Sequence, residues 1–315
     1  MKIVILDKDT LGADIDLSPL AAVGECTVYG TTRPEEVAAR VADAAVVVTN
    51  KLKLGEHNLA AAQALRLICV AATGYDNIDT AYCRRRGIAL CNVPGYSTDS
   101  VAQLTVAMAL SLVTHLTEYR TFTHTGAYTA AGLANCLTPV YHELSSMTWG
   151  VVGGGGIGTR VAEIVRAMGC RVVMCRRKAE GEFPLCDIDT LCRTADIVSL
   201  HLPLSEETRG LISRERIAAM KQGAILINTA RGAVTDEAAV AEAVESGRLG
   251  GFGVDVYATE PFAEDHPFWR LRNRDNVCMT PHMAWGSFEA RARCVRRMAE
   301  NITRFFAGET HNRIV

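Results

Sequence analysis

Three predicted strands in the second half of the chain are each followed by a residue of a type that is common in active sites. Arg231, Glu260 and His282 each come shortly after a buried apolar run. These runs are predicted strands at 224–228, 251–256 and 277–280. Ligands of open α/β sheets bind at the carboxyl ends of the strands, so we expect the three side chains to converge. Each alone could be an ordinary surface or loop residue, but three coincidences at successive strand ends are improbable, and we interpret them as a reaction centre.

A glycine-rich loop lies upstream of these residues. Gly153, Gly155 and Gly158 form G-x-G-x-x-G between a predicted strand at 148–152 and a predicted helix at 159–168. The first glycine permits a tight turn, the second lets the backbone approach a pyrophosphate, and the third lets helix and strand pack closely. A merely flexible turn is the alternative, but the flanking strand and helix favour a dinucleotide site. Two further residues of the loop, just before the predicted helix, belong to this predicted site, Gly156 and Ile157.

The residues after the next strand bear on the choice of coenzyme. An NAD-selective site places Asp or Glu about 20 residues after the glycine loop to hold the ribose 2′-hydroxyl. Here the strand ends in Arg176, Arg177 and Lys178, with no carboxylate. Cations at this position can pair with a 2′-phosphate, so we predict NADP(H), with NAD(H) possible. The alternative is that these charges only solvate the surface.

Short apolar runs alternate with segments of helical period along most of the chain, which predicts an α/β protein with two doubly wound parallel sheets. Strands of the first series are predicted at 2–6, 27–29, 45–49, 67–71 and 88–91, with helices near 34–41, 57–64 and 80–86. Strands of the second series are predicted at 148–152, 171–175, 197–200, 224–228, 251–256 and 277–280. Six strands is the count of a doubly wound nucleotide-binding domain.

The domain boundaries follow from two segments. A turn-rich stretch at 93–100 precedes a long apolar helix, whose start we predict from the capping-box spacing of Ser100 and Gln103. After Pro281 another helix, at 287–306, is expected to return to the first domain. We therefore predict one domain from residues 1–100 with 284–315 and a second from 101–283.

Composition excludes several classes of function. The 315 residues carry 33 Lys and Arg against 35 Asp and Glu, so no basic field exists to hold nucleic acid or an anionic membrane. The apolar stretch without charge at 100–117 is too polar for a membrane span, and we expect no secretory signal at the start of the chain. Eleven cysteines without a C-x-x-C pair fit neither a disulfide framework nor a zinc site. We expect a cytoplasmic protein with reduced thiols and no metal.

The motifs taken together resemble the D-isomer-specific 2-hydroxyacid dehydrogenases, in an order and spacing that are highly specific. The resemblance covers nearly the whole chain and is strongest to the glycerate dehydrogenase, or hydroxypyruvate reductase, branch. It implies a Rossmann cofactor domain inserted into a flavodoxin-like substrate domain. The motifs are Ala72-Thr-Gly-Tyr-Asp-Asn-Ile-Asp79, Asn92-Val-Pro-Gly, the glycine loop, His201-Leu-Pro-Leu, Asn228-Thr-Ala-Arg-Gly, Asp255-Val through Glu260-Pro, and Pro281-His-Met-Ala-Trp.

The resemblance also implies roles for the residues at the strand ends. His282 would protonate the carbonyl oxygen of a 2-keto acid as hydride arrives, and Glu260 would hold the ring and stabilise its protonated form. Arg231 would bind the substrate carboxylate and polarise the carbonyl. Asp255 would accept a hydrogen bond from the nicotinamide carboxamide.

Further residues are assigned by the same resemblance. The cofactor site would include Thr105, His201, Leu202, Pro203, Thr208, Thr229 and Ala230. The substrate site would include Thr73, Gly74, Trp285, Arg231 and His282, and Asn50 and Lys51 could touch the distal group of the substrate. For Asn50 and Lys51 a solvated strand end is an equal alternative.

The predicted activity is the NAD(P)H-dependent reduction of a small 2-keto acid, of hydroxypyruvate or glyoxylate type, to the D-2-hydroxy acid. The alternatives are a phosphoglycerate-type or other D-2-hydroxyacid dehydrogenase and a cofactor-sensing interaction protein of the corepressor type. The resemblance further implies a homodimer. We expect the helix after residue 100 as its contact, because its apolar content exceeds what one face of a domain needs.

Overall fold

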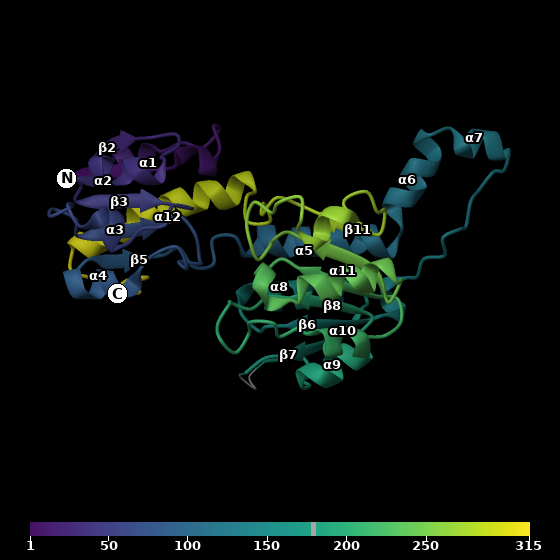
Figure 1. Cartoon of the computed structure of the whole chain (residues 1–315). Helices are drawn as coiled ribbons and strands as arrows, with labels where there is room; N and C mark the ends of the chain where they lie inside the picture. Colours follow the sequence, from purple (N-terminus) through teal and green to yellow (C-terminus); the bar gives the residue numbers. More distant parts are fainter. Residues whose placement is uncertain (178–180) are drawn as a thin grey trace. The chain divides into compact units, whose positions relative to one another are not determined.

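The computed structural model describes residues 1–177 and 181–315, which divide into two units (Figure 1). Unit 1 comprises Met1–Ser97 and Trp285–Val315, and unit 2 comprises Thr98–Ala284. The predicted boundaries lie within three residues of these divisions. Both units consist of a parallel sheet and its helices, which confirms the predicted fold class.

Unit 1 contains five parallel strands in the order β2-β1-β3-β4-β5. The strands are β1 (Lys2–Ile5), β2 (Glu25–Val28), β3 (Val46–Thr49), β4 (Leu67–Val70) and β5 (Ala89–Cys91). This 2-1-3-4-5 order is the flavodoxin-like one, in which ligands bind at the carboxyl ends beside the point where the order reverses. All five predicted strands are present, with ends that differ by one or two residues.

The helices of unit 1 cover this sheet and include the last helix of the chain. They are α1 (Ser18–Ala21), α2 (Val37–Val41), α3 (Glu56–Leu59), α4 (Thr80–Arg86) and α12 (Phe288–Phe306). The predicted helix at 57–64 is shorter than expected, because α3 ends at Leu59. Cys294, Met298 and Ile302 of α12 are buried in one core with residues of β1, β3 and β4. The C-terminal helix therefore returns to the first part of the chain, as predicted.

Unit 2 contains six parallel strands in the order β11-β10-β9-β8-β6-β7. They are β6 (Thr148–Val152), β7 (Arg171–Cys175), β8 (Ile197–Leu200), β9 (Ala224–Asn228), β10 (Leu249–Val254) and β11 (Val277–Met279). All six were predicted, although β10 begins and ends two residues earlier than expected. Beyond β7, an isolated parallel bridge joins Met174 to Leu185, where the third strand of a classical Rossmann sheet lies.

The long helix after the boundary differs from the prediction at its start. α5 spans Thr98–Val113, so the predicted cap at Ser100 is wrong. Ser100 lies in the first turn, and its hydroxyl donates a hydrogen bond to the carbonyl oxygen of Ala284 at 2.6 Å. Eight residues of α5 are buried, and the helix packs on β9, β10 and α8 (Gly156–Ala167). Most of the apolar side chains of α5 are therefore covered within the unit, while Leu104 and Leu110 are partly buried, and the dimer contact on α5 stays a prediction.

The other helices of unit 2 are α6 (Leu116–His124), α7 (Ala127–Ala131), α9 (Ile188–Thr194), α10 (Arg214–Ala219) and α11 (Glu237–Glu245). In Figure 1, α6 and α7 project away from the sheet of unit 2, and neither contains a buried residue. Among the residues that the structure describes, no single helix has the length and apolar character to cross a membrane. The pair of α5 and α6 passes that test by length and composition, but the two helices are bent by 62° at their break.

The glycine loop joins β6 to α8 with close main-chain packing. Gly153 has a φ of +107°, and a Cβ there would overlap the carbonyl of His201. A Cβ on Gly158 would overlap the carbonyl oxygen of Gly153, so the first turn of α8 lies directly on the loop. A Cβ on Gly155, by contrast, would meet no atom within 4 Å. The packing of the chain therefore requires glycine at positions 153 and 158, whereas the space beside the Cα of Gly155 is empty.

This difference predicts a large loss of stability for an alanine at Gly158 and almost none for an alanine at Gly155. We expect Gly158→Ala to lower the free energy of unfolding by about 2 kcal/mol, because the added methyl group forces main-chain atoms apart. Gly155→Ala should change it by less than about 0.5 kcal/mol, because its backbone is extended and its Cβ space is empty. Urea denaturation of both variants without coenzyme measures the difference. Equal losses would contradict this account of the loop.

Candidate functional site

The three residues predicted as a reaction centre follow three neighbouring strands of one sheet. β9, β10 and β11 lie side by side in unit 2, and Arg231, Glu260 and His282 follow them in that order. Oε2 of Glu260 lies 2.6 Å from Nδ1 of His282. Both side chains remain about a quarter to a third exposed, so the pair is reachable from solvent. The carboxylate engages Nδ1, which leaves Nε2 as the ring nitrogen suited to transferring a proton.

A buried carboxylate holds the turn that carries His282. His282 has a left-handed φ of +53°, and the two residues after it donate their backbone N–H groups to Asp255. The N–H of Met283 donates to Oδ1 of Asp255 at 2.8 Å, and the N–H of Ala284 donates to Oδ2 at 2.9 Å. Burial raises the pKa of Asp255, whereas hydrogen bonds from Thr280, Ala284 and Met283 act in the opposite direction. In this structure, Asp255 positions the His282 turn.

A second set of hydrogen bonds fixes Glu260. The backbone N–H of Tyr257 donates to Oε1 of Glu260 at 2.9 Å, and the Tyr257 hydroxyl donates to the carbonyl oxygen of Thr280 at 2.9 Å. Burial raises the pKa of Tyr257, which keeps the hydroxyl protonated as a donor. Tyr257 therefore ties the segment after β10 to the segment after β11.

The turn that carries Arg231 is organised by Asn228. The side-chain amide of Asn228 donates to the carbonyl oxygen of Arg231 at 3.0 Å, and its oxygen accepts from the N–H of Ala230 at 3.1 Å. Asn228, Tyr257 and Thr280 were not predicted as site residues. They could have been identified in the sequence, because each is a polar or aromatic residue near the end of a strand, close to a predicted site residue.

The predicted cofactor residues all lie in unit 2, and the main chain of His201 borders Gly153 of the glycine loop. Thr105 of α5 and Thr229 after β9 are buried, and their hydroxyl oxygens lie 2.9 Å apart. Thr208 shapes the loop after β8, because its hydroxyl donates to the carbonyl of Pro203 at 2.7 Å. Nε2 of His201 lies 2.9 Å from the hydroxyl of Ser199, and burial lowers the pKa of His201 to about 3, so its ring is neutral.

The two arginines after β7, Arg176 and Arg177, have different surroundings. Arg177 forms an ion pair with Glu207, and both side chains are exposed. Arg176 instead lies over the glycine loop, where its side chain borders Gly154 and its guanidinium borders Gly181. Within residues 1–177 and 181–315, Nε and Nη2 of Arg176 are buried without a hydrogen-bond partner. Lys178, which the prediction also invoked, lies outside the described residues.

Of the predicted substrate residues, Arg231 and His282 belong to unit 2, whereas Asn50, Lys51, Thr73, Gly74 and Trp285 belong to unit 1. The buried carboxylate of Asp7 accepts the backbone N–H of Asn50 at 2.9 Å and that of Lys51 at 2.7 Å, and so fixes the segment after β3. Burial raises the pKa of Asp7, although these hydrogen bonds act against the shift. After β4, the side-chain amide of Asn92 donates to the carbonyl oxygen of Thr73 at 2.7 Å, which orients the backbone leading to Gly74. Trp285 packs edge-to-face on Tyr96 in the same unit.

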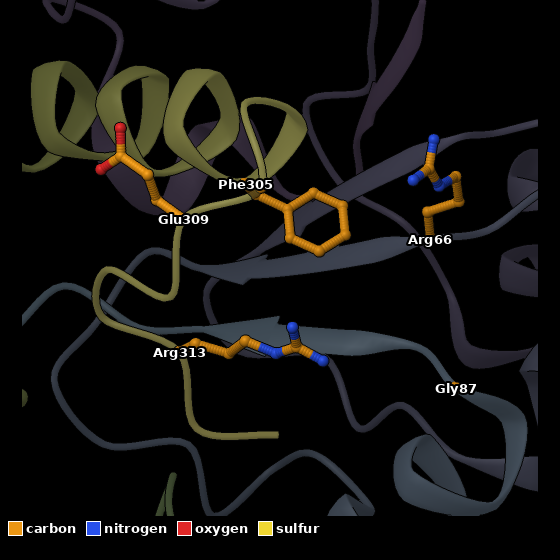
Figure 2. Close-up of a pocket in the computed structure, with 6 residues that line it drawn as sticks. Arg66, Gly87, Phe305, Glu309 and Arg313 are labelled. Atoms are coloured by element: carbon orange, nitrogen blue, oxygen red, sulfur yellow. The ribbon is translucent and has the colours of Figure 1, made fainter.

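A pocket of about 330 Å³ in unit 1 does not include any of these residues (Figure 2). It is lined by Arg66, Gly87, Phe305, Gly308, Glu309 and Arg313. Arg66 and Gly87 precede β4 and β5, so the pocket lies at the amino ends of these strands. Asn50, Lys51, Thr73 and Gly74 lie at the opposite edge, where parallel sheets bind their ligands.

The comparisons with known proteins agree with this arrangement. Residues 106–284 match the model of the D-isomer specific 2-hydroxyacid dehydrogenase, NAD binding domain. A hydroxypyruvate reductase of Blautia hydrogenotrophica is 33% identical, over 99% of both chains. Among solved structures, an acyclic imino acid reductase in complex with NADPH and D-Arg is 27% identical over the whole of both chains, with a TM-score of 0.86. The D-lactate dehydrogenase of Aquifex aeolicus, complexed with NAD and lactic acid, is 28% identical over 99% of this chain and 97% of that one, with a TM-score of 0.82.

The match to the family model covers more than half of the chain, including the glycine loop and the strand ends that carry Arg231, Glu260 and His282. The match to the reductase extends over both units. This chain therefore belongs to the family of D-isomer-specific 2-hydroxyacid dehydrogenases, oxidoreductases with a nicotinamide-dinucleotide domain.

Proposed function

We propose that the protein reduces a small 2-keto acid, of hydroxypyruvate or glyoxylate type, to the D-2-hydroxy acid with NADPH. The observation that carries the proposal is the 2.6 Å contact between Glu260 and His282, on strands adjacent to the one that leads to Arg231. A carboxylate-bound imidazole is a proton donor and acceptor suited to a carbonyl-to-alcohol reaction. The name of the reductase from Blautia hydrogenotrophica supports the substrate class.

Each residue has one task in this mechanism. The reduced nicotinamide, when bound, supplies the hydride. His282 gives the proton on Nε2 to the carbonyl oxygen, while Glu260 accepts the hydrogen bond from Nδ1 and stabilises the imidazolium before transfer. Arg231 pairs with the substrate carboxylate and polarises the carbonyl. In the reverse direction, neutral His282 takes the hydroxyl proton.

Residues of unit 1 would select the substrate. The backbone amides of Thr73 and Gly74 would bind its carboxylate, and Asn50, Lys51 and Trp285 would contact its distal group. Support comes from the hydrogen bonds that fix these segments: Asn92 holds Thr73, and Asp7 holds Asn50 and Lys51. Preorganised backbone donors bind an anion without first losing conformational freedom.

Two substitutions test the mechanism. His282→Ala should lower kcat by about 10³-fold, because it removes the proton donor. Glu260→Gln should lower kcat about 10-fold to 100-fold, because a neutral amide does not stabilise the imidazolium as a carboxylate does. Absorbance of NADPH with hydroxypyruvate, glyoxylate and pyruvate measures both effects.

Two results would contradict the proposal. A Glu260→Gln variant with the wild-type kcat would refute the assigned pairing of Glu260 with His282. If the wild-type protein oxidises NADPH with none of these keto acids but still binds the coenzyme, the cofactor-sensing alternative is favoured.

The preference for NADPH rests on Arg176. Two nitrogens of its guanidinium are buried and have no hydrogen-bond partner among the described residues. Burying such donors costs free energy unless an anion accepts hydrogen bonds from them. Arg176 borders the loop whose glycine pattern is typical of pyrophosphate binding, so a 2′-phosphate on the adenosine ribose fits the donor. Arg177 already has a carboxylate partner in Glu207 and is less suited to the task.

This difference between neighbouring arginines gives a matched experiment. Arg176→Gln should reduce the preference for NADPH over NADH, measured as the ratio of kcat/KM values, by about 10-fold to 100-fold, since charge-assisted hydrogen bonds are lost. Arg177→Gln should change the ratio by less than about 3-fold, because its exposed ion pair contributes little. An unchanged ratio in the Arg176 variant would refute the phosphate-pairing argument.

We further propose that two copies of the chain associate through the arm formed by residues 116–141. Six large apolar side chains on this arm are exposed: Leu116, Tyr128, Leu133, Leu137, Val140 and Tyr141. Exposed apolar side chains concentrated on one segment mark a protein contact surface. A second copy is the partner that the family resemblance implies, and we propose this surface as a contact in addition to α5.

The arm can be tested without affecting the reaction centre. Leu137 is 74% exposed, and Leu137→Glu should raise the dimer dissociation constant at least 10-fold, because it places a charge in an apolar contact. Met168→Glu, a similar change at an exposed apolar residue outside the arm, should leave it unchanged. Sedimentation velocity measures both. A monomeric wild-type protein, or equal effects of the two variants, would contradict the proposed dimer.

A further inference from the structure

The segment that carries Glu260 has no regular secondary structure of its own. It runs from the end of β10 to a 3₁₀ turn at Pro267–Leu271, and residues 258–261 are exposed. A carboxylate on such a loop needs contacts from other elements if it is to stay within hydrogen-bond distance of His282. Displacements of about 1 Å can reduce the rate of an enzyme 100-fold, so these contacts bear directly on function.

Glu237, the first residue of α11, supplies two such contacts. Its Oε1 accepts a hydrogen bond from the backbone N–H of Ala258 at 2.9 Å, and its Oε2 lies 2.9 Å from Nε2 of His266. The Glu237 and His266 side chains are only 12% and 10% exposed. One shielded carboxylate thus binds the loop before and after Glu260.

The surroundings of His266 set the direction of these hydrogen bonds. Nδ1 of His266 accepts the backbone N–H of Phe268 at 3.1 Å, so the proton of the neutral ring is on Nε2, which donates to Glu237. The ring also contacts Phe262 and Phe268, with centroids 5.0 Å away in each case. His266 therefore has a defined tautomer and a packed position.

The same loop contacts the turn of Arg231. A Cβ on Gly232 would overlap the main chain of Tyr257 and Ala258, so the two loops touch through their backbones. Glu237 follows this turn in the chain and reaches Ala258 with its carboxylate. The Arg231 turn and the Glu260 loop are thus held against each other at two places.

From these contacts we propose that Glu237 and His266 are a positioning pair that holds Glu260 against His282. Both act through the Glu260 loop, so the inference rests on the proposed function of Glu260. Glu237 binds the N–H beside Tyr257, whose own N–H is bound to Glu260. Loss of the pair would let Glu260 move away from the imidazole without removing any group that touches the substrate.

Glu237→Gln disrupts the pair with little change in volume. A glutamine offers one oxygen, so its NH₂ group must face either the Ala258 N–H or the His266 Nε2–H. If the proton of His266 is instead on Nδ1, this nitrogen can no longer accept the N–H of Phe268, and that hydrogen bond is lost. At least one of the three hydrogen bonds is therefore lost in E237Q.

A double-mutant cycle tests whether Glu237 acts through Glu260. We expect E237Q to lower kcat about 10-fold while KM for the keto acid changes less than 2-fold. In the E260Q background the same change should have no further effect, because the group it positions is gone. The control is E242Q on the same helix, which removes an exposed ion pair with Arg214 and should leave kcat unchanged.

A spectroscopic measurement tests the pair without substrate. The hydrogen-bonded Nδ1 proton of His282 should give a downfield ¹H NMR resonance, assigned by its loss in H282A. E237Q should move this resonance towards its position in E260Q, whereas E242Q should not.

The proposal is wrong if E237Q lowers only the melting temperature, if the E237Q and E260Q effects on kcat are additive, or if the wild-type resonance is absent. A wild-type protein inactive on every keto acid refutes the proposed function instead. In that case the resonance alone decides whether Glu237 positions Glu260.

Discussion

The Asp255 carboxylate, buried at the end of β10, accepts hydrogen bonds from the two backbone amides that follow His282. These bonds oppose the cost of burying a charge, and they hold a turn in which His282 has a left-handed backbone. The imidazole can meet Glu260 only while that turn is in place. The geometry of the reaction centre thus depends on an interaction with no direct part in proton transfer.

The parallel sheets place these groups where they can act together. Because β9, β10 and β11 are adjacent and run in one direction, the residues after them gather at one edge of unit 2. Around that edge, Asn228 shapes the Arg231 turn, Tyr257 fixes Glu260, and Glu237 holds the intervening loop. The same principle operates in unit 1, where Asp7 binds the segment after β3. In each case a shielded polar side chain converts an irregular loop into a defined structure.

The sequence predicted every strand of both sheets and the return of the last helix, because buried parallel strands are apolar runs between turns. It was less accurate at helix starts. Ser100 satisfies the capping-box spacing, yet α5 begins at Thr98 and Ser100 bonds to Ala284, a residue far away in the chain. This error arose because a local pattern does not specify which distant residues will satisfy it.

The sequence by itself determined the fold class, the family, and the chemical types of the residues at the strand ends, because these depend on local periodicity and on motifs in a fixed order. Only the tertiary structure decided how the groups are paired. It joined Glu260 to His282 and brought Glu237 to Ala258 and His266. It also gave Arg177 a carboxylate partner, whereas two buried nitrogens of Arg176 have no partner within the described part of the chain. Such pairings depend on distances between residues remote in the chain, and these distances are set when the strands and helices pack together.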